Sequence, residues 1–467
     1  MLRLAHALAA ALAAAPCAPP PDAATQPPAA PERPPGAAEI DADASNASLR
    51  RLAAHGAWLR RMVSAMRLER AGAPASGEFL SALAVDADPR VRSAAILAMA
   101  RTGAEPIARL AATEEDPRVV RTMLRCGWQV DAERVERGAR ALARSQDNSE
   151  RLLAVELLGA LEVQGRSSAK LGDFAKDTLC SVIARLDRDD GGALSPRIAA
   201  LTGARDSRQD WKWRLWLDRN RASLRVDGVT PARKAAPGEE NPVAKLDDAA
   251  FVRFTSALDT LFSKPIDLGV AIDCTGSMAG EIAQAQAGID DLMRFVNAVA
   301  GGMRVGVVGY RDEQDDFETL GWDFTEDPAV ARERLWKLSA EGGGDEPELV
   351  QEALKVAYGR FAWRPESQQV MVLVGDAPPT PGWGTRCAEM SRAARARGIV
   401  TYVLSARDER KPDEVKHFPE IARAGGGRVI RLTDRSDLVA ELAGIALSDT
   451  WHDQMVAVFE RYLLLCR

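Results

Sequence analysis

The chain has 467 residues, of which 46% are hydrophobic, and its formal net charge is −6. A chain of this length normally folds into two or three domains, and its hydrophobic content is sufficient for well-packed cores. The slightly acidic balance gives no electrostatic reason to expect nucleic acid as a partner. The six cysteines are scattered and form no Cys-x-x-Cys pair, so we interpret them as small core residues, with a disulfide as an alternative.

An export signal is predicted at residues 1–18. An early arginine, Arg3, precedes a short apolar stretch that ends in small residues, as is typical of secretory signal peptides. The alternative is an alanine-rich start of a cytosolic protein. Lipid attachment at Cys17 is a less favoured alternative, because Pro16 departs from the usual lipoprotein cleavage box. We therefore expect an exported protein, whether periplasmic, secreted or attached to the cell envelope, and no other stretch is apolar enough to span a membrane.

Repeated segments follow a Pro- and Ala-rich stretch, which we expect to be a disordered spacer. Each repeat opens on an aspartate that can cap the helix after it: Asp88, Asp116 and Asp147. Pro89 and Pro117 come next, at the first helical position, where proline loses no hydrogen bond. The apolar residues that follow have helical spacing, so each unit is predicted to be a helix pair that stacks on its neighbours. The Asp-Pro-x-Val-Arg opening resembles short HEAT-type repeats, although the third copy lacks the proline and the valine.

A tryptophan-rich segment lies near the end of this helical region, between Trp211 and Trp216. Tryptophan and arginine together are typical of binding hot spots. We favour the more ordinary interpretation of a final amphipathic helix that caps the repeats.

The rest of the chain alternates strands and helices. A lead-in helix is expected near Asp248–Phe262. The predicted strands are Ile266–Ile272, Arg304–Tyr310, Phe317–Phe324, Val370–Val374, Val400–Leu404 and Arg428–Leu432, of which the second and third form an antiparallel hairpin. Nearly continuous apolar strands separated by helices favour a doubly wound, mostly parallel α/β sheet covered on both faces. In such sheets, ligands bind beyond the carboxyl ends of the strands.

The first of these strands ends in oxygen-bearing side chains. Asp273, Thr275 and Ser277 occupy alternate positions just before a predicted helix. Carboxylate and hydroxyl oxygens suit Mg²⁺ or Mn²⁺, and a helix amino terminus favours an anion beside the metal. This segment resembles the metal-ion-dependent adhesion site of von Willebrand factor type A domains, whose signature is Asp-x-Ser/Thr-x-Ser.

Two later segments strengthen the resemblance, which covers about residues 265–446. Asp345 lies in Gly-Gly-Gly-Asp-Glu-Pro-Glu, where the family usually has a threonine ligand, and Asp376 ends a strand where the family supplies its last aspartate. The resemblance implies a metal site of Asp273, Thr275, Ser277, Asp345 and Asp376 that holds Mg²⁺ or Mn²⁺. Because Asp345 replaces threonine, we expect firmer metal binding, weaker attraction for a partner's carboxylate, and acceptance of Ca²⁺ as an alternative.

Each of these residues also has a structural interpretation. The aspartates can cap helices or start turns, and the hydroxyls can bind backbone amides. We interpret the neighbouring Arg311 and Asp312 as a structural ion pair. No enzyme is predicted, because Gly276-Ser277 lacks the glycines of a nucleophile elbow and no nucleotide-binding loop is present.

The sequence therefore predicts an exported, non-enzymatic interaction protein that binds an acidic side chain of a protein ligand through its metal. The alternatives are a metal-independent scaffold that binds through the helical repeats and, less favoured, an accessory subunit of a hydrolase. The predicted parts are a signal peptide at 1–18, a spacer at 19–45, HEAT-like repeats at 46–226, a linker at 227–247 and a type A domain at 248–467.

Overall fold

The computed structural model describes residues 57–69, 76–163, 165, 169–186, 194–195, 197–199, 201–204, 210–224, 226, 241–261, 264–313, 315–343, 347–406, 415–432 and 438–466. All of them belong to one compact unit that begins at Ser48 and ends at Arg467. The predicted signal peptide and spacer, most of the predicted linker, and Asp345 lie outside these described residues.

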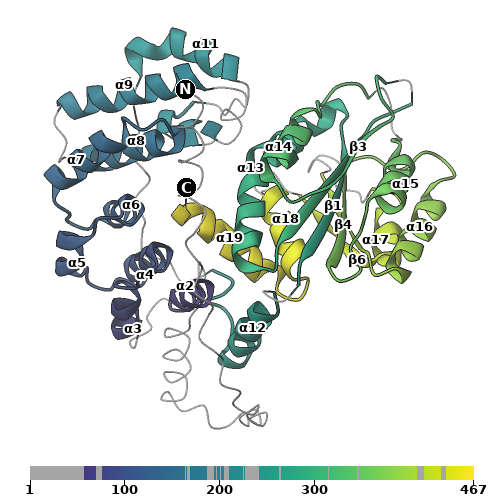
Figure 1. Cartoon of the computed structure of the whole chain (residues 1–467), viewed down its shortest axis with the longest axis horizontal. Helices are drawn as coiled ribbons and strands as arrows, with labels where there is room; N and C mark the ends of the chain where they lie inside the picture. The colour runs from purple at the N-terminus through teal and green to yellow at the C-terminus, as the bar shows by residue number, and fades with distance from the viewer. Residues whose placement is uncertain are drawn as a thin grey trace, which may run out of the picture. The chain divides into compact units, whose positions relative to one another are not determined.

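The first part of the described chain is helical (Figure 1). Its helices are α2 (Trp58–Arg67), α3 (Ser76–Leu83), α4 (Pro89–Thr102), α5 (Ala108–Thr113), α6 (Pro117–Arg125), α7 (Ala132–Leu142), α8 (Asn148–Val163), α9 (Ala169–Arg185) and α11 (Asp210–Asn220). We call the segment from α2 to α11 the helical region. Its assignment to HEAT-type repeats stays a prediction.

The predicted helix caps are confirmed. Asp88, Asp116 and Asp147 each accept a hydrogen bond from the backbone N–H two residues later, at 2.9, 2.8 and 2.7 Å. Each carboxylate satisfies a donor that has no partner within its own helix, which stabilises the start of that helix. Pro89 and Pro117 are the first residues of α4 and α6, as expected.

The second part contains a six-stranded sheet, preceded by α12 (Asp248–Leu261). Its strands are β1 (Ile266–Asp273), β2 (Met303–Tyr310), β3 (Thr319–Thr325), β4 (Gln368–Gly375), β5 (Val400–Ser405) and β6 (Gly426–Arg431). The strand order is β3-β2-β1-β4-β5-β6; β3 is antiparallel to β2, and all other pairs are parallel. The predicted fold class, the hairpin and every predicted strand are therefore confirmed.

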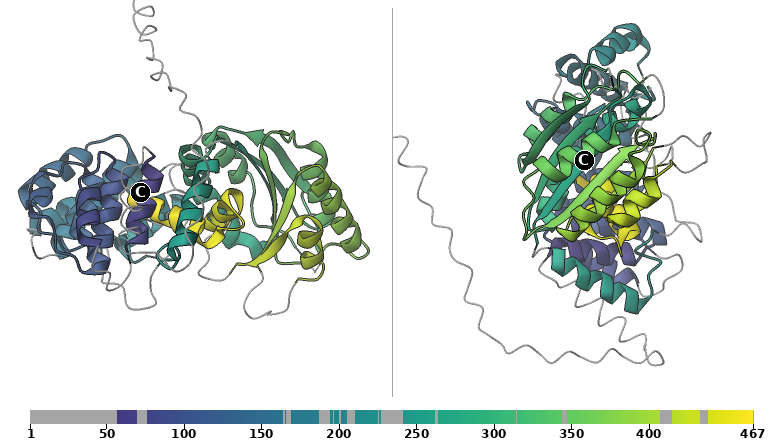
Figure 2. Two further views of the ribbon diagram at one scale, coloured as in Figure 1. Left: turned by 90° about the horizontal axis from the view of Figure 1, so that it is seen from below. Right: turned by 90° about the vertical axis from the view of Figure 1, so that its right-hand side faces the viewer.

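Helices cover both faces of the sheet (Figure 2). They are α13 (Ala279–Val299), α14 (Pro328–Trp336), α15 (Val350–Arg360), α16 (Gly384–Ala396), α17 (Phe418–Ala424), α18 (Leu438–Leu447) and α19 (His452–Cys466). Residues of β1 alternate between the two covered faces, as the pleat of a strand requires. Leu268 and Ile272 belong to the apolar core that contains residues of α13 and α18, whereas Ala271 belongs to the core that contains residues of α15.

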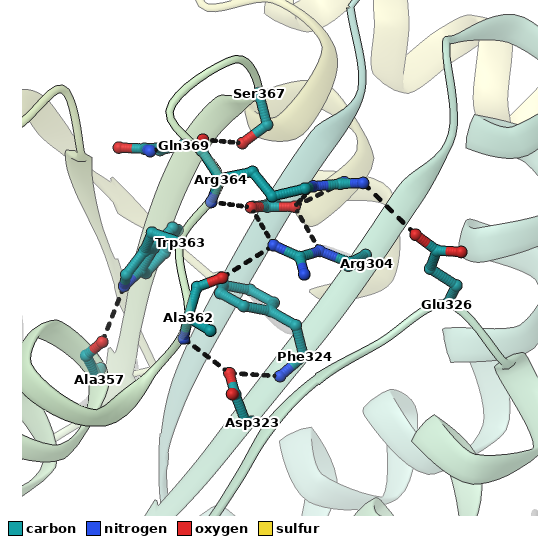
Figure 3. Close-up of polar contacts among 11 residues, drawn as sticks. Arg304, Asp323, Phe324, Glu326, Ala357, Ala362, Trp363, Arg364, Ser367 and Gln369 are labelled. Atoms are coloured by element: carbon teal, nitrogen blue, oxygen red, sulfur yellow. Dashed lines mark hydrogen bonds and ion pairs between the residues drawn. The ribbon is translucent and has the colours of Figure 1, made fainter.

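The same alternation places both aspartates of β1, Asp267 and Asp273, on the face of Ala271. Asp267 is fully buried near the start of the strand. It accepts five hydrogen bonds of 2.6 to 2.9 Å from Arg304 and Arg364, and Figure 3 shows these two guanidinium groups together. Burial disfavours the charged carboxylate, but the hydrogen bonds from the two arginines outweigh burial and hold the pKa of Asp267 below its usual value.

We expect Asp267→Asn to lower the free energy of unfolding by about 3 kcal/mol, because the substitution leaves Arg304 and Arg364 short of a charged acceptor. Urea denaturation measures this change. Glu326→Gln is the matched control, since Glu326 bonds the same Arg364 at 3.4 Å but its side chain is 72% exposed, and it should cost less than about 0.5 kcal/mol. Equal effects of the two substitutions would contradict a structural role for the buried pair.

Candidate metal site

The candidate site lies at the carboxyl edge of the sheet, where three parallel strands end side by side. Asp273 is the last residue of β1, Asp312 follows β2, and Asp376 follows β4. Because β1 pairs with both β2 and β4 in parallel, their carboxyl ends meet at one edge. The chain continues from Asp273 through a short 3₁₀ turn, Gly276–Met278, into α13.

Asp273 is fully buried, and its two carboxylate oxygens differ in their contacts. Oδ1 accepts hydrogen bonds from the backbone N–H of Thr275 at 2.8 Å and from its hydroxyl at 2.7 Å. Oδ2 has no hydrogen-bond partner among the described residues. The Thr275 hydroxyl also lies 3.4 Å from the hydroxyl of Ser277, which is exposed. The structure therefore brings the three predicted residues of this loop together.

Gly375, the last residue of β4, leaves room beside this carboxylate. A Cβ atom built at Gly375 would lie 2.4 Å from the hydroxyl oxygen of Tyr310 and 3.5 Å from Oδ2 of Asp273. Tyr310 is fully buried, and its hydroxyl donates to the carbonyl of Val374 at 3.2 Å. A larger residue at position 375 would therefore clash with the hydroxyl of Tyr310.

The second loop packs directly on the first. The Gly276 N–H donates to the carbonyl of Gly342 at 3.3 Å, and a Cβ at Gly343 would lie 2.9 Å from Cβ of Thr275. Gly342 and Gly343 both have φ of 78°, a left-handed conformation that favours glycine. The described chain thus reaches Thr275 two residues before Asp345, whose own position lies outside the described residues. Asp376, the remaining predicted ligand, is half-buried at the end of β4.

Sequence reasoning missed two acidic residues, Asp312 and Glu348. Both are buried, with exposures of 8% and 4%, and a side-chain hydrogen bond joins them. The Arg311 guanidinium donates to the carbonyl and hydroxyl of Ser339, at 2.7 and 2.9 Å, and its predicted ion pair with Asp312 stays a prediction. The available signal for Asp312 was its place just after β2, at the same sheet edge as Asp273.

Glu348 belongs to the loop before α15 and is held against the loop that follows Asp376. Its backbone N–H donates to the carbonyl of Pro378 at 2.9 Å, and its carbonyl accepts from the N–H of Thr380 at 3.2 Å. Its Oε2 atom, like Oδ2 of Asp273, has no hydrogen-bond partner among the described residues. A short-range sequence pattern gives no sign of this contact, because it joins two loops that are distant along the chain.

The electrostatics of the site follow from this crowding of carboxylates. Burial raises the pKa of Asp273 to about 7; the hydrogen bonds from Thr275 oppose the rise, and the charges of Asp376 and Asp312 add to it. Burial, together with the charges of Asp273 and Asp312, raises the pKa of Glu348 to about 9. A bound cation would offset the cost of ionising these buried carboxylates, because it favours the charged form of each of them.

The donor set fits a hard divalent cation. It offers carboxylate and hydroxyl oxygens, which are the ligands that Mg²⁺, Mn²⁺ and Ca²⁺ take in proteins. Within the described part of the chain, no three His, Cys, Asp or Glu side chains form a ready metal-binding group by themselves. The hydroxyls of Thr275 and Ser277 lie beside Asp273 and add neutral oxygens to these carboxylates.

We expect Asp273→Asn to stabilise the protein in the presence of a chelator, by about 1 to 4 kcal/mol above pH 7. The folded-state pKa of about 7 exceeds the unfolded value of 3.8, so the wild type loses stability as the pH rises through this interval. The gain from Asp273→Asn should accordingly vanish below about pH 4. Thermal and urea unfolding across this range measure the difference; a gain that is the same at low and high pH would contradict the burial of an unpaired carboxylate.

Comparison with known proteins finds one family model that matches part of the chain. Residues 267–434 match the family model of the von Willebrand factor A domain. Among solved structures, the chain is similar to the crystal structure of the conserved hypothetical protein BatB from Bacteroides thetaiotaomicron, with 16% sequence identity and a TM-score of 0.28. That similarity covers 43% of this chain and 98% of that chain.

No curated protein matches the chain. In the part of the chain that the structure describes, every helix is too short or too polar to cross a membrane. The family match and the observed sheet coincide over the same residues. The match to the von Willebrand factor A domain model therefore falls on the sheet of the second part of the chain, at residues 267–434.

Proposed function

We propose that this chain is an exported protein-interaction module whose von Willebrand factor A domain binds a protein ligand through a divalent metal. Domains of this family generally serve as protein-interaction modules. The observation that carries the proposal is the contrast between two buried aspartates on one strand. Asp267 is neutralised by two arginines, whereas Oδ2 of Asp273 has no partner among the described residues. A buried carboxylate oxygen without a partner is costly, and a bound cation would offset that cost.

Five residues of this chain would hold the cation. Thr275 and Ser277 would contact the cation directly through their hydroxyls, and Asp273, Asp345 and Asp376 would do so directly or through water. Oδ1 of Asp273 already accepts from Thr275, so the first loop holds its oxygens in place before any ligand arrives. Bound Mg²⁺ or Mn²⁺, with Ca²⁺ as an alternative, would supply a positive charge that attracts an acidic side chain of the partner. That carboxylate would fill the remaining position.

The export signal and the repeats complete the proposal. The apolar start of the sequence supports export, and the helical region supports a scaffold role. A specific observation also favours the rival function, a metal-independent scaffold. Trp211 and Leu215 lie one turn apart on α11, and they are 56% and 41% exposed. Ligand binding that survives chelation would favour this rival.

We expect calorimetric titration of Mg²⁺, Mn²⁺ and Ca²⁺ into the chelator-treated full chain to show saturable binding at one site. Asp273→Asn should abolish it, because this substitution removes the buried charge at the centre of the site. Asp316→Asn is the matched control, since Asp316 is an exposed carboxylate in the loop that also carries Asp312, and it should leave the affinity within about twofold. No binding by the wild type, or equal loss in both variants, would contradict the proposed metal site.

We expect Asp345→Thr to weaken metal binding about tenfold or more, because it removes one negative charge from the site. The same variant should bind a small carboxylate probe, such as acetate in the presence of saturating Mg²⁺, more tightly than the wild type does. Both affinities can be measured by calorimetry. An unchanged metal affinity would show that Asp345 lies outside the site. Ser339→Ala, in the segment between α14 and α15 that also contains Asp345, is the control for general disturbance of this segment.

A further inference from the structure

A fully buried carboxylate, that of Glu69, lies just after α2 in the helical region. Its principal partner is Arg461 on the last helix, α19: both guanidinium Nη atoms donate to the carboxylate, one of them at 3.0 Å. Arg461 is itself only 7% exposed. Asn241 donates to the same carboxylate at 2.8 Å, and Arg101 lies 3.4 Å from it. Because a buried charge needs a partner, separation of α19 from α2 would cost Glu69 its principal partner and would break the ion pair of Arg461 with Glu69.

Aromatic side chains of α19 pack against both α13 and α2. Towards the sheet, the rings of Phe459 and Tyr462 lie 5.2 and 5.0 Å from the ring of Phe295 on α13. Towards the helical region, Tyr462 lies 6.1 Å from Trp58 on α2. Figure 1 shows α19 between α13 and α4, and it contacts both. As a result, buried residues from α2 through α9 and residues from β1, α13, α18 and α19 form one continuous apolar cluster.

The segment that leads into α12, from Asn241 to Asp248, is also bound to the end of α2. The Arg67 guanidinium, at the end of α2, donates to the carbonyl of Ala244 at 2.7 Å and to the carboxylate of Asp248 at 3.1 Å. Asn241 also donates to the carbonyl of Met66 at 3.1 Å. The segment that precedes α12 and the helix that ends the chain therefore both meet the end of α2.

We infer that α19, which lies beyond the segment that matches the family model, joins the helical region and the von Willebrand factor A domain into one cooperative folding unit, with the Glu69–Arg461 pair at its centre. Two regions joined only by a polar linker would unfold independently. Here the continuous core and the buried ion pair make each region part of the other's stability. A cation or partner bound at Asp273 then stabilises α2 and α4 as well, because ligand binding stabilises the whole unit that unfolds together.

Native-state hydrogen exchange on the full chain tests this inference. The most protected amides of α4 and of β4 should have the same opening equilibrium constant. In Arg461→Met, which keeps the apolar stem but removes the principal partner of Glu69, both sets should exchange at least ~100-fold faster. Arg137→Met is the matched control, because Arg137 is 69% exposed and lies 3.9 Å from Glu133, and it should change exchange by less than about threefold.

Faster exchange in α4 alone, with β4 as protected as in the wild type, would overturn the inference, and so would the reverse. If Arg461→Met does not accumulate as a folded protein, the wild type in increasing guanidinium chloride decides the question. The protection of α4 and β4 should then converge on a single unfolding transition. If the opening equilibrium constants of α4 and β4 stay more than about tenfold apart, the two regions unfold as independent units.

Discussion

The central constraint on this structure is the burial of two carboxylates on one face of a central strand. β1 lies between β2 and β4, and helices cover the sheet on both sides, so no water-exposed position is available to Asp267 or Asp273. Protein arginines compensate the first charge. The second lies at the carboxyl edge, where the chain supplies hydroxyls, glycines and further carboxylates instead. The two ends of the strand therefore differ: one carries a structural ion network, and the other carries the site at which we propose a bound cation.

The acidic character of the site has a direct chemical consequence. Asp312 and Glu348 add carboxylates to the set that the family signature implies, and the charge of Asp312 helps to raise the pKa of Asp273. The carboxylates would neutralise the charge of a cation bound there more fully than two carboxylates would. Such a site holds its metal firmly and attracts an incoming carboxylate less strongly, so the partner's other contacts would contribute more of the affinity.

Much of the fold could be predicted from the sequence because its signals are local. The aspartates and prolines that open α4 and α6 act on the next turn of their own helices, and apolar strands of this kind imply a parallel sheet. The loop of Asp273 could also be predicted, since its residues alternate along one short segment. The roles of Glu348 and Arg461 could not, because they depend on contacts between segments that are distant in the sequence. The hydrogen bond from Arg311 to Ser339 has the same character, because it too joins segments that are distant in the sequence.

The most direct test of the account is a crystal structure of the full chain grown with Mn²⁺, in which anomalous scattering locates the metal independently of any assumed ligand. We expect one strong anomalous peak beside Oδ2 of Asp273, within about 2.0 to 2.3 Å of the hydroxyl oxygens of Thr275 and Ser277. The absence of a peak there, with Oδ2 of Asp273 satisfied by a side chain or a water molecule instead, would contradict it.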